Sequence, residues 1–429
     1  MRPKKQNDVG QQDLFRNRLD QIIDLNHPLA RLAKLVDWGR LHKEFSVYYA
    51  EVGRSGTPIR LMVGLHLLKH MYALSDELVC AQWVENPYFQ YFCGEIFFQH
   101  RVPIERSGLS HFRDRIGPAS FESILQESLA IACELGALKL KDLKAVAVDT
   151  TVQEKNIAHP TEHALLSKAI DKLGDLARRA GIKLRQSYTR VVKKAAIKVG
   201  RYIHAKQMRR AKRELKFIRV RLGRLIRDIE RKVKDVTHKL PIDFDVTLRK
   251  AKRIHQQKRG DPDYLYSWHA PEVECISKGK ARAPYEFGVK VSMGTNLRAS
   301  GENGKHFIVH TKAMHGRPYD GHTLSKAGEN IEKIIGRLPE RFIVDKGYKG
   351  HKWDEPRTRV FQSGQKRGVT PAIKKDIKRR SVIEPIIGHA KNDGLLRRNY
   401  LKGRKGDEIN AILSGIGFNF RQITAVLAA

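Results

Sequence analysis

The segment from Lys378 to Lys391 reads Lys-Arg-Arg-Ser-Val-Ile-Glu-Pro-Ile-Ile-Gly-His-Ala-Lys, and it sets one acid, Glu384, among several bases. Glu384 follows Arg380 by four residues and precedes Lys391 by seven, so on a helix the carboxylate and both cations share one face. Mg²⁺ prefers carboxylate oxygens, while Arg and Lys suit the phosphates that such an ion accompanies. The segment therefore predicts part of a site for a metal ion and phosphates.

Two further acids follow apolar runs that are typical of buried strands. Leu143-Lys-Ala-Val-Ala-Val stops at Asp149, and Arg341-Phe-Ile-Val stops at Asp345. Acids at the carboxyl ends of buried strands face a crevice. We therefore expect Asp149, Asp345 and Glu384 to converge and to supply three carboxylates to one site.

Each acid also has a purely structural interpretation. Asp149 with Thr150 could form a turn at the end of a strand, and Asp345 with Gly347 has a composition that is common in turns. Ser381 to Glu384 fits a capping box, in which the Glu384 carboxylate accepts a hydrogen bond from the Ser381 amide. Pro385 favours a helix start at this point, which argues against one continuous helix from Arg380 through Glu384.

The chain is strongly basic. Its 429 residues include 82 Lys and Arg against 46 Asp and Glu, a formal charge of +36. An excess of this size indicates a polyphosphate partner, with nucleic acid the leading candidate. The sequence has no apolar run of about 18 residues and no secretory segment, so we expect a soluble, intracellular protein without a membrane partner. The four cysteines form no C-x-x-C pair, which argues against a zinc knuckle.

Periodicity and composition divide the chain into four expected domains: an all-helical front (1–138), a segment with a buried strand (139–161), a basic helical insertion (162–260) and a region of further strands and helices (261–429). In the front, a buried helix follows Pro58 and another is capped by Ser75. Strand patterns cover 285–293, 307–311 and 342–344, and helical patterns cover 321–335, 381–391 and 407–427. This order predicts an α/β fold of the α+β type, with a mixed sheet and helices on its faces.

Two basic segments could contact nucleic acid. Ser107 to Arg115 resembles a short helix that enters a DNA groove, or it is the solvated face of an ordinary helix. The insertion holds about thirty basic and about nine acidic residues, and its apolar residues, such as Leu173, Leu222 and Ile229, form stripes at helical spacing. Its cations could follow a DNA backbone without reading the sequence, or they could form a charged surface with no ligand.

Taken together, the three acidic stretches resemble the DDE transposases of bacterial insertion sequences, specifically the insertion sequence five type within the insertion sequence four group. The resemblance rests on Asp149-Thr-Thr, on Asp345-Lys-Gly-Tyr-Lys-Gly, and on Arg380, Glu384 and Lys391 at the group's spacing. Further similar segments extend it over nearly the whole chain: Ser75-Asp-Glu-Leu, Phe92-Cys-Gly-Glu, Tyr266-Ser-Trp-His-Ala-Pro-Glu-Val-Glu, Tyr285-Glu-Phe-Gly-Val-Lys and Asn399-Tyr-Leu-Lys-Gly.

The resemblance implies an RNase H-like catalytic core preceded by a helical domain that binds DNA ends. It implies a transposase that binds the terminal inverted repeats of its element, cleaves the DNA ends by metal-assisted hydrolysis and joins the 3′ hydroxyl to target DNA. The implied partners are double-stranded DNA and a second copy of the chain on that DNA, without a small-molecule substrate. The implied location is the bacterial cytoplasm, in association with the nucleoid.

The resemblance also assigns roles to residues. Asp149, Asp345 and Glu384 are implied to hold two Mg²⁺ ions, with Mn²⁺ as a substitute. The implied nucleic-acid-binding residues are Arg380, Lys391 and Lys346, which position phosphates, and Tyr348, which stacks on or bonds to the end nucleotide.

One position departs from the group's pattern, because Ile377 stands where the group has a Tyr three residues before the Arg. Any phosphate contact made by that Tyr is absent here or is replaced, with Tyr348 as the candidate. Two other functions stay open on this sequence. One is a non-catalytic DNA-binding relative that occupies element ends. The other is a purely hydrolytic nuclease of the same fold.

Overall fold

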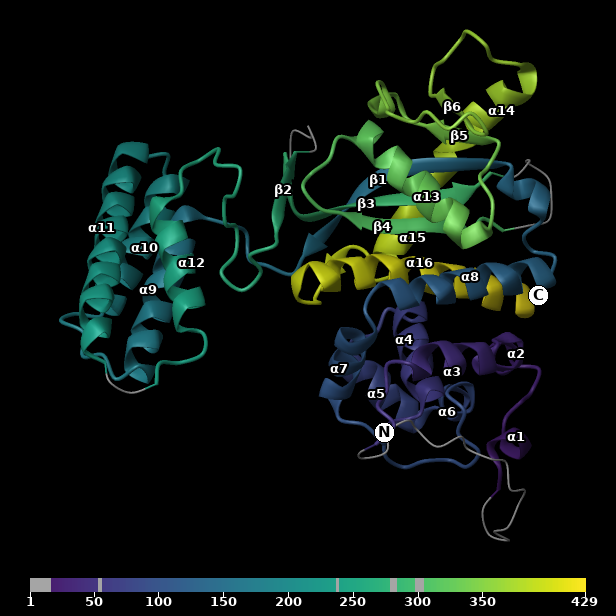
Figure 1. The fold of residues 1–429 in the computed structure, drawn as a ribbon, viewed down its shortest axis with the longest axis horizontal. Coiled ribbons are helices and arrows are strands. Elements are labelled where there is room, and N and C mark those ends of the chain that lie inside the picture. Colours follow the sequence, from purple (N-terminus) through teal and green to yellow (C-terminus); the bar gives the residue numbers. More distant parts are fainter. Residues whose placement is uncertain (1–16, 53–55, 237–238, 278–283, 298–304) are drawn as a thin grey trace. The chain divides into compact units, whose positions relative to one another are not determined.

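A computed structural model of the chain describes residues 17–52, 56–236, 239–277, 284–297 and 305–429. The chain forms two compact units, the first made of Met1–Lys155 with Gly288–Ala429 and the second of Asn156–Phe287 (Figure 1). The fold is mixed α/β, as the sequence predicts.

The helices of the first unit are α1 (Leu19–Ile22), α2 (Pro28–Leu35), α3 (Trp38–Ser46), α4 (Ile59–Met71), α5 (Asp76–Glu85), α6 (Pro87–Phe92), α7 (Arg106–Ile116), α8 (Ala119–Glu134), α13 (Leu324–Ile335), α14 (Pro371–Arg379), α15 (Ile383–Asn392) and α16 (Gly403–Leu427). Local chemistry explains several starts. The Ser75 hydroxyl accepts a hydrogen bond from the Leu78 amide over 3.1 Å, and the Asn86 side chain caps α6 in the same way. These helix starts confirm the predictions made from cap residues.

The strands are β1 (Ala145–Lys155), β2 (Glu274–Ser277), β3 (Tyr285–Asn296), β4 (Ile308–Met314), β5 (Arg341–Val344), β6 (Arg359–Gln362) and β7 (Arg398–Asn399). The sheet order is β2-β3-β1-β5-β6, with β4 paired to β3 and β7 paired to β1. β3 runs antiparallel to both β1 and β4, whereas β5 runs parallel to β1 and to β6. The prediction of a mixed sheet is therefore confirmed.

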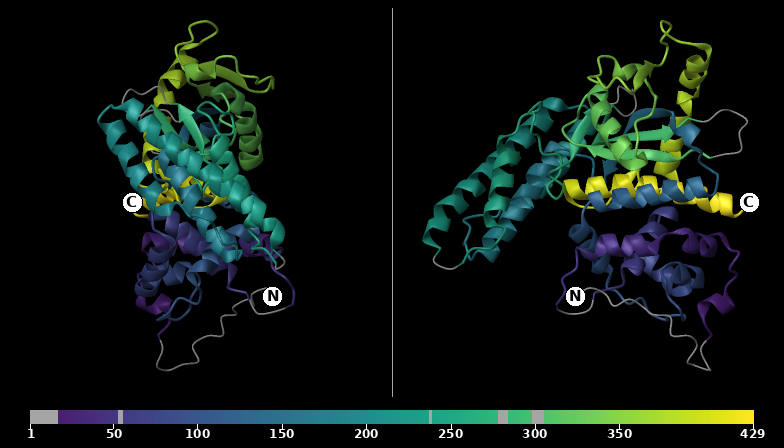
Figure 2. Two further views of the ribbon diagram at one scale, coloured as in Figure 1. Left: turned by 90° about the vertical axis from the view of Figure 1, so that its left-hand side faces the viewer. Right: turned by 45° about the vertical axis from the view of Figure 1, so that its right-hand side comes forward.

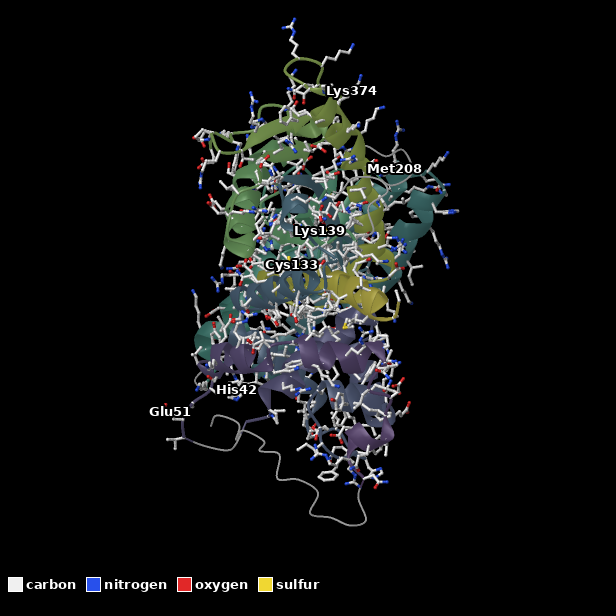
Figure 3. All side chains as sticks on the ribbon, turned by 90° about the vertical axis from the view of Figure 1, so that its right-hand side faces the viewer. His42, Glu51, Cys133, Lys139, Met208 and Lys374 are labelled. Atoms are coloured by element: carbon white, nitrogen blue, oxygen red, sulfur yellow. The ribbon has the colours of Figure 1, made fainter. Side chains whose placement is uncertain are left out.

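One hydrophobic core joins the helical front to one face of the sheet. It contains α4 and α8, the even-numbered β1 residues Val146 and Val148, and the apolar faces of α13 and α16. α8 and α16 lie side by side, and α16 also contacts α4 and β4 (Figures 1 and 2). Figure 3 shows His42 on α3 and Lys374 on α14 at opposite ends of this unit. Because the core is shared, the division of this unit into a helical front (1–138) and a catalytic core stays a prediction.

The second unit is mainly helical, also contains β2, and has its own core. It contains α9 (Glu162–Arg179), α10 (Thr189–His204), α11 (Met208–Lys232) and α12 (Phe244–Gln256). Leu173, Leu222 and Ile229 are among the residues that close this core, and they come from the predicted helical stripes. The unit begins at Asn156 and ends at Phe287, whereas the sequence places the insertion at 162–260. Across the described ranges, no helix is long and apolar enough to cross a membrane.

Candidate active site

Strand register brings two of the predicted acids together. The last parallel pair between β1 and β5 is Val148 with Val344, and the next residues are Asp149 and Asp345. The expectation that Asp149 ends its strand was wrong, because β1 continues to Lys155 in pairing with β3. The crevice opens instead because β5 stops at Val344, so from Asp149 onward β1 no longer has β5 as a partner on that side.

Strand periodicity selects the face on which the acids lie. Side chains alternate along a strand, so Asp149 shares a face with Ala147, and Asp345 shares a face with Ile343. Ala147 and Ile343 belong to a small apolar cluster that also contains Ile383, the first residue of α15. Both acids therefore point to the side of the sheet that α15 covers.

The helix α15 presents the third acid. Ile383, Ile386 and Ala390 are its buried residues, while Glu384 is exposed in its first turn. Pro385 fits this first turn, where a missing amide costs no helical hydrogen bond.

The 3₁₀ turn η5 (Arg380–Val382) connects α14 to α15, so Arg380 and Glu384 lie on a nearly continuous helical segment. The alternative of a capping box does not fit the structure. α15 has no side-chain cap, and the Ser381 hydroxyl donates to the Lys378 carbonyl over 3.2 Å. The Glu384 carboxylate instead accepts a hydrogen bond from Arg380.

Arg380 gathers the three acids. Its Nη1 donates to Asp149 Oδ2 over 3.2 Å, and its Nη2 lies 3.1 Å from Glu384 Oε1 and 3.7 Å from Asp345 Oδ1. The Arg380 side chain is 14% exposed, whereas those of Asp149, Asp345 and Glu384 are 23%, 49% and 63% exposed. The structure thus brings all three predicted carboxylates onto one largely buried guanidinium.

A fourth acid lies next to this cluster and was missed from the sequence. Asp320, in the 3₁₀ turn η3 (Asp320–Thr323), accepts hydrogen bonds on Oδ1 from Thr150 Oγ1 and from Lys290 Nζ, both over 2.7 Å. The local sequence Pro318-Tyr-Asp-Gly indicates only a turn. No signal in the sequence points to the pairing of Asp320 with Thr150, because that pairing depends on strand register.

Burial is the main influence on Asp149. It raises the pKa of this carboxyl above its ordinary value, and the charges of Asp345 and Asp320 act in the same direction. The Thr150 amide, which donates to Asp149 over 2.7 Å, and the Arg380 charge lower the pKa but do not cancel the effect of burial. The Arg380 charge therefore favours the charged form of Asp149, against the effect of burial.

Tyr348 does not have the position that its predicted role requires. Its side chain is 1% exposed and belongs to the core beneath the sheet. Burial and the nearby charge of Asp149 raise the pKa of its phenol well above the ordinary value. A ring in this position cannot stack on a nucleotide, nor can it replace the Tyr that is absent at Ile377. Ile377 itself packs against the apolar cluster of Ile383.

The two lysines that were predicted to bind phosphate each follow one of the acids in the sequence. Lys346 directly follows Asp345, its side chain is exposed, and its stem lies against the backbone of Gly364. Lys391 is half-buried near the end of α15. Their role in positioning phosphates stays a prediction.

Asp149, Asp345 and Glu384 are the residues that could hold a metal ion. Carboxylate oxygens are the ligands that Mg²⁺ prefers, so the chemistry of this donor set fits such an ion. Among the described residues, however, no group of three or more His, Cys, Asp or Glu has the arrangement of a ready metal site. The three carboxylates are oriented on the Arg380 guanidinium instead.

Comparison with known proteins adds independent information. Residues 17–115, which include α1 to α7 apart from the last residue of α7, match the model of a family described as a transposase domain (DUF772). A protein of Rhizobium meliloti, described as uncharacterized protein ORF8 in nfe locus, is 49% identical over 207 residues, which make up 48% of this chain and the whole of that protein. No solved structure matches the chain. The transposase-domain match covers the helical front and does not reach the three acids.

Proposed function

This chain is a transposase-like protein of the same family as the Rhizobium meliloti protein, and from that premise we propose that it is a DDE transposase of the insertion sequence five type. It binds the terminal inverted repeats of its element, cleaves the DNA ends and joins the 3′ hydroxyl to target DNA. The observation that supports this proposal is the convergence of Asp149, Asp345 and Glu384 on Arg380 from three separate elements. Turn and cap chemistry alone gives no reason for that convergence.

The arrangement of strands and acids also supports an RNase H-like core. Two acids follow neighbouring parallel strands, the third lies on a helix that covers the same face, and the helical insertion falls between β1 and β3. The formal charge of +36 supports double-stranded DNA as the partner.

Asp149, Asp345 and Glu384 would hold two divalent ions, Mg²⁺ or Mn²⁺. When bound, such ions activate a water or a 3′ hydroxyl for attack on a phosphodiester and stabilise the leaving oxygen. The Arg380 guanidinium, once it leaves the carboxylates, carries a planar pair of donors that suits a backbone phosphate. Lys290 and Thr150 hold the Asp320 carboxylate in a fixed orientation, so it adds negative charge beside Asp149.

In the free protein Arg380 has a different role. Two carboxylates on adjacent parallel strands repel each other, and a buried carboxylate is costly without a counter-charge. The guanidinium supplies that counter-charge and orients all three acids before DNA and metal arrive. Arg380 is therefore a positioning residue in the free state and a phosphate-binding residue with DNA.

The experiment that tests this proposal uses linear DNA with pre-cut element ends, a target plasmid and Mg²⁺. A transposase joins the 3′ hydroxyl ends to the plasmid, which gives a product that a sequencing gel resolves. Shortened ends without joined product would favour a hydrolytic nuclease. Tight binding without any change to the DNA would favour the non-catalytic relative. In either case strand joining by this chain would be excluded.

A further inference from the structure

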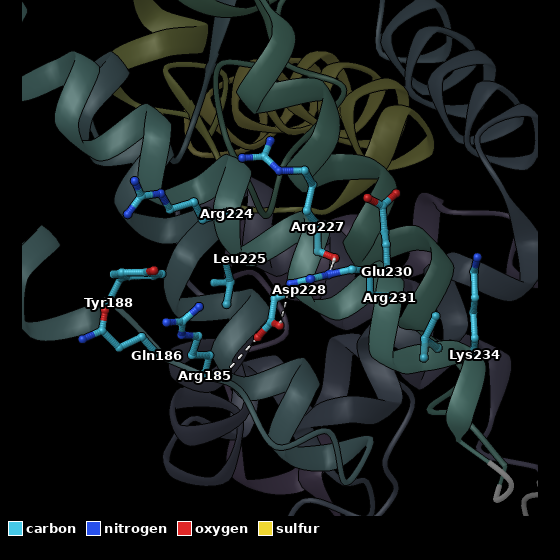
Figure 4. Close-up of a pocket in the computed structure, with 11 residues that line it drawn as sticks. Arg185, Gln186, Tyr188, Arg224, Leu225, Arg227, Asp228, Glu230, Arg231 and Lys234 are labelled. Atoms are coloured by element: carbon cyan, nitrogen blue, oxygen red, sulfur yellow. Dashed lines mark hydrogen bonds and ion pairs between the residues drawn. The ribbon is translucent and has the colours of Figure 1, made fainter.

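The helical second unit contains a large hollow that the chemistry above does not use. It is open to solvent and has a volume of about 1170 Å³. Its wall is formed by α11, by the 3₁₀ turn η2 (Val233–Asp235) that follows α11, and by the segment that connects α9 to α10 (Figure 4). Arg224, Arg227 and Arg231 line it from α11, at a spacing that places them along one side of that helix, and Arg185 and Tyr188 line it from the connecting segment.

The acids of this wall are already neutralised. Asp228 accepts a hydrogen bond from the Arg185 amide over 3.1 Å and pairs with Lys232 over 3.1 Å and with Arg231 over 3.3 Å. Glu230 pairs with Lys252 over 2.5 Å. Neither carboxylate therefore has to be displaced before an anion enters the hollow.

Four cations of the wall remain available. The side chains of Arg185, Arg224, Arg227 and Lys234 are exposed, and within the described part of the chain none of them forms an ion pair with an acid. Figure 4 shows Arg224 and Arg227 projecting from the same helix, with Asp228 below them. Such an excess of positive charge is unusual for a solvated helix, which usually carries both positive and negative side chains. It favours a polyanionic ligand.

The dimensions suit a nucleic acid backbone. Ten residues of helix rise about 15 Å, so the row from Arg224 through Arg227 to Lys234 can follow consecutive phosphates of one strand. Arginine also binds phosphate through two parallel N–H donors, which a lysine cannot do. The open hollow has room for a backbone and lacks the enclosure that a small ligand needs.

We propose that this hollow binds the phosphodiester backbone of duplex DNA through Arg185, Arg224, Arg227 and Lys234, without reading base sequence. The inference rests on the proposed function in taking DNA as the partner. It adds a second DNA-contacting site, on the helical unit and apart from the three acids.

The test measures binding of the full chain to a fluorescent duplex of arbitrary sequence in EDTA, as a function of salt. The variant carries Arg185→Gln, Arg224→Gln, Arg227→Gln and Lys234→Gln. The matched control removes four exposed cations of α10 that do not line the hollow, with Lys193→Gln, Lys194→Gln, Lys198→Gln and Arg201→Gln. The slope of log K against log salt falls by about 0.9 for each phosphate that the protein no longer neutralises, so we expect a fall of about 2 to 4 in the variant and less than about 1 in the control.

Two outcomes would overturn the proposal. One is equal weakening of DNA binding in the variant and the control. The other is binding of poly-glutamate to the wild type as tightly as duplex DNA, with the same weakening in the variant, which would assign the hollow to an acidic peptide. If the quadruple variant does not fold, as judged by its thermal transition, the double variant Arg224→Gln with Arg227→Gln replaces it. The slope of log K against log salt should then fall by about 1 to 2.

The same assay separates this inference from the proposed chemistry. Binding in EDTA is measured without divalent ions, so its outcome does not depend on whether the three acids support strand joining. A negative result for the hollow would therefore leave the role of the three acids untouched.

Discussion

Asp149 and Asp345 occupy the next positions after Val148 and Val344, the last residues in register between the parallel strands β1 and β5. The two carboxylates consequently lie at the same level of the sheet, and both face α15. Arg380 holds them together with Glu384 through contacts of 3.1 to 3.7 Å.

Arg380→Gln should increase the affinity of the free protein for Mn²⁺ by roughly tenfold, because the cation that competes for the three carboxylates is removed. The measurement is a Mn²⁺ titration followed by electron paramagnetic resonance or calorimetry. Arg379→Gln is the matched control, since Arg379 is the adjacent residue and pairs with Asp376 over 3.4 Å instead. Unchanged or weaker Mn²⁺ binding by Arg380→Gln would show that the guanidinium does not occupy the metal position.

Asp76→Asn should lower the free energy of unfolding by about 3 to 5 kcal/mol, because it leaves buried cations without a partner. Asp76 pairs with Arg113 and with Lys69, both over 2.6 Å, and Arg113 also lies 3.3 Å from a ring nitrogen of His66. Burial raises the pKa of Asp76, but Arg113 and Lys69 outweigh it and hold the pKa well below the ordinary value. Urea unfolding at neutral pH measures the change.

The exposed Asp114, on the same α7 helix as Arg113, provides the control for this network. Asp114→Asn should change the free energy of unfolding by no more than about 0.5 kcal/mol. A similar small change for Asp76→Asn would mean that the buried network contributes little to stability.

The features of this structure that could be predicted from the sequence are those that depend on residues close together in the chain. Helix starts at Ser75 and Asn86 follow from side chains that bond amides two or three residues away, so they could be predicted. The same holds for the apolar runs before the acids, which predict buried strands that include Val148 and Val344. The three acids could be identified from their order and from the group's spacing.

The features that could not be predicted depend on contacts between segments that are distant in the sequence. β6, which pairs with β5, is short and half-exposed, and β1 continues beyond Asp149 only because β3 supplies a partner. The burial of Tyr348 follows from the packing of η4 (Lys346–Tyr348) against the core, which no local pattern reveals. For the same reason Asp320 was missed and Arg380 was assigned to DNA without its contacts to the acids.

Acidification should destabilise the fold between about pH 6.5 and pH 4, and His310 is one cause. Burial lowers the pKa of His310 from 6.5 to about 4 in the folded chain, helped by the charge of Lys312 and opposed by the contact with Asn330 and the charge of Glu122. The unfolded chain therefore binds a proton in this window that the folded chain does not, so stability falls as the pH falls. His66, whose pKa burial lowers to about 3, acts in the same direction.

His310→Gln should remove the contribution of this one proton to the pH dependence of stability. The loss of unfolding free energy between pH 6.5 and pH 4 should then be smaller than in the wild type by a total of the order of 3 kcal/mol. Urea unfolding at several pH values measures the slope. The exposed His111 on α7 serves as the control, and His111→Gln should leave the slope as in the wild type. A slope that stays unchanged in His310→Gln would refute the assignment.

Gly417→Ala should destabilise the first unit by about 1 to 3 kcal/mol through a clash where α16 crosses α4. A Cβ atom at this position would lie 2.5 Å from the carbonyl oxygen of His70, and backbone cannot give way as a flexible side chain does. Gly388→Ala on α15 is the matched control, because no atom lies within 4 Å of its added Cβ. Helix propensity predicts that this control gains up to about 1 kcal/mol. Thermal unfolding distinguishes the two, and destabilisation of equal size in both would contradict this account of the crossing.

The central claim is that Asp149, Asp345 and Glu384 together perform strand cleavage and joining. It is tested most directly with a DNA fragment that carries the flanking element ends, in Mg²⁺, with the wild type and Glu384→Gln compared for joined product and for DNA binding. The account predicts that the wild type joins strands and that joining by Glu384→Gln falls by at least about a hundredfold while it still binds the ends. Equal joining by both proteins, or no joining by either despite tight binding, would contradict it.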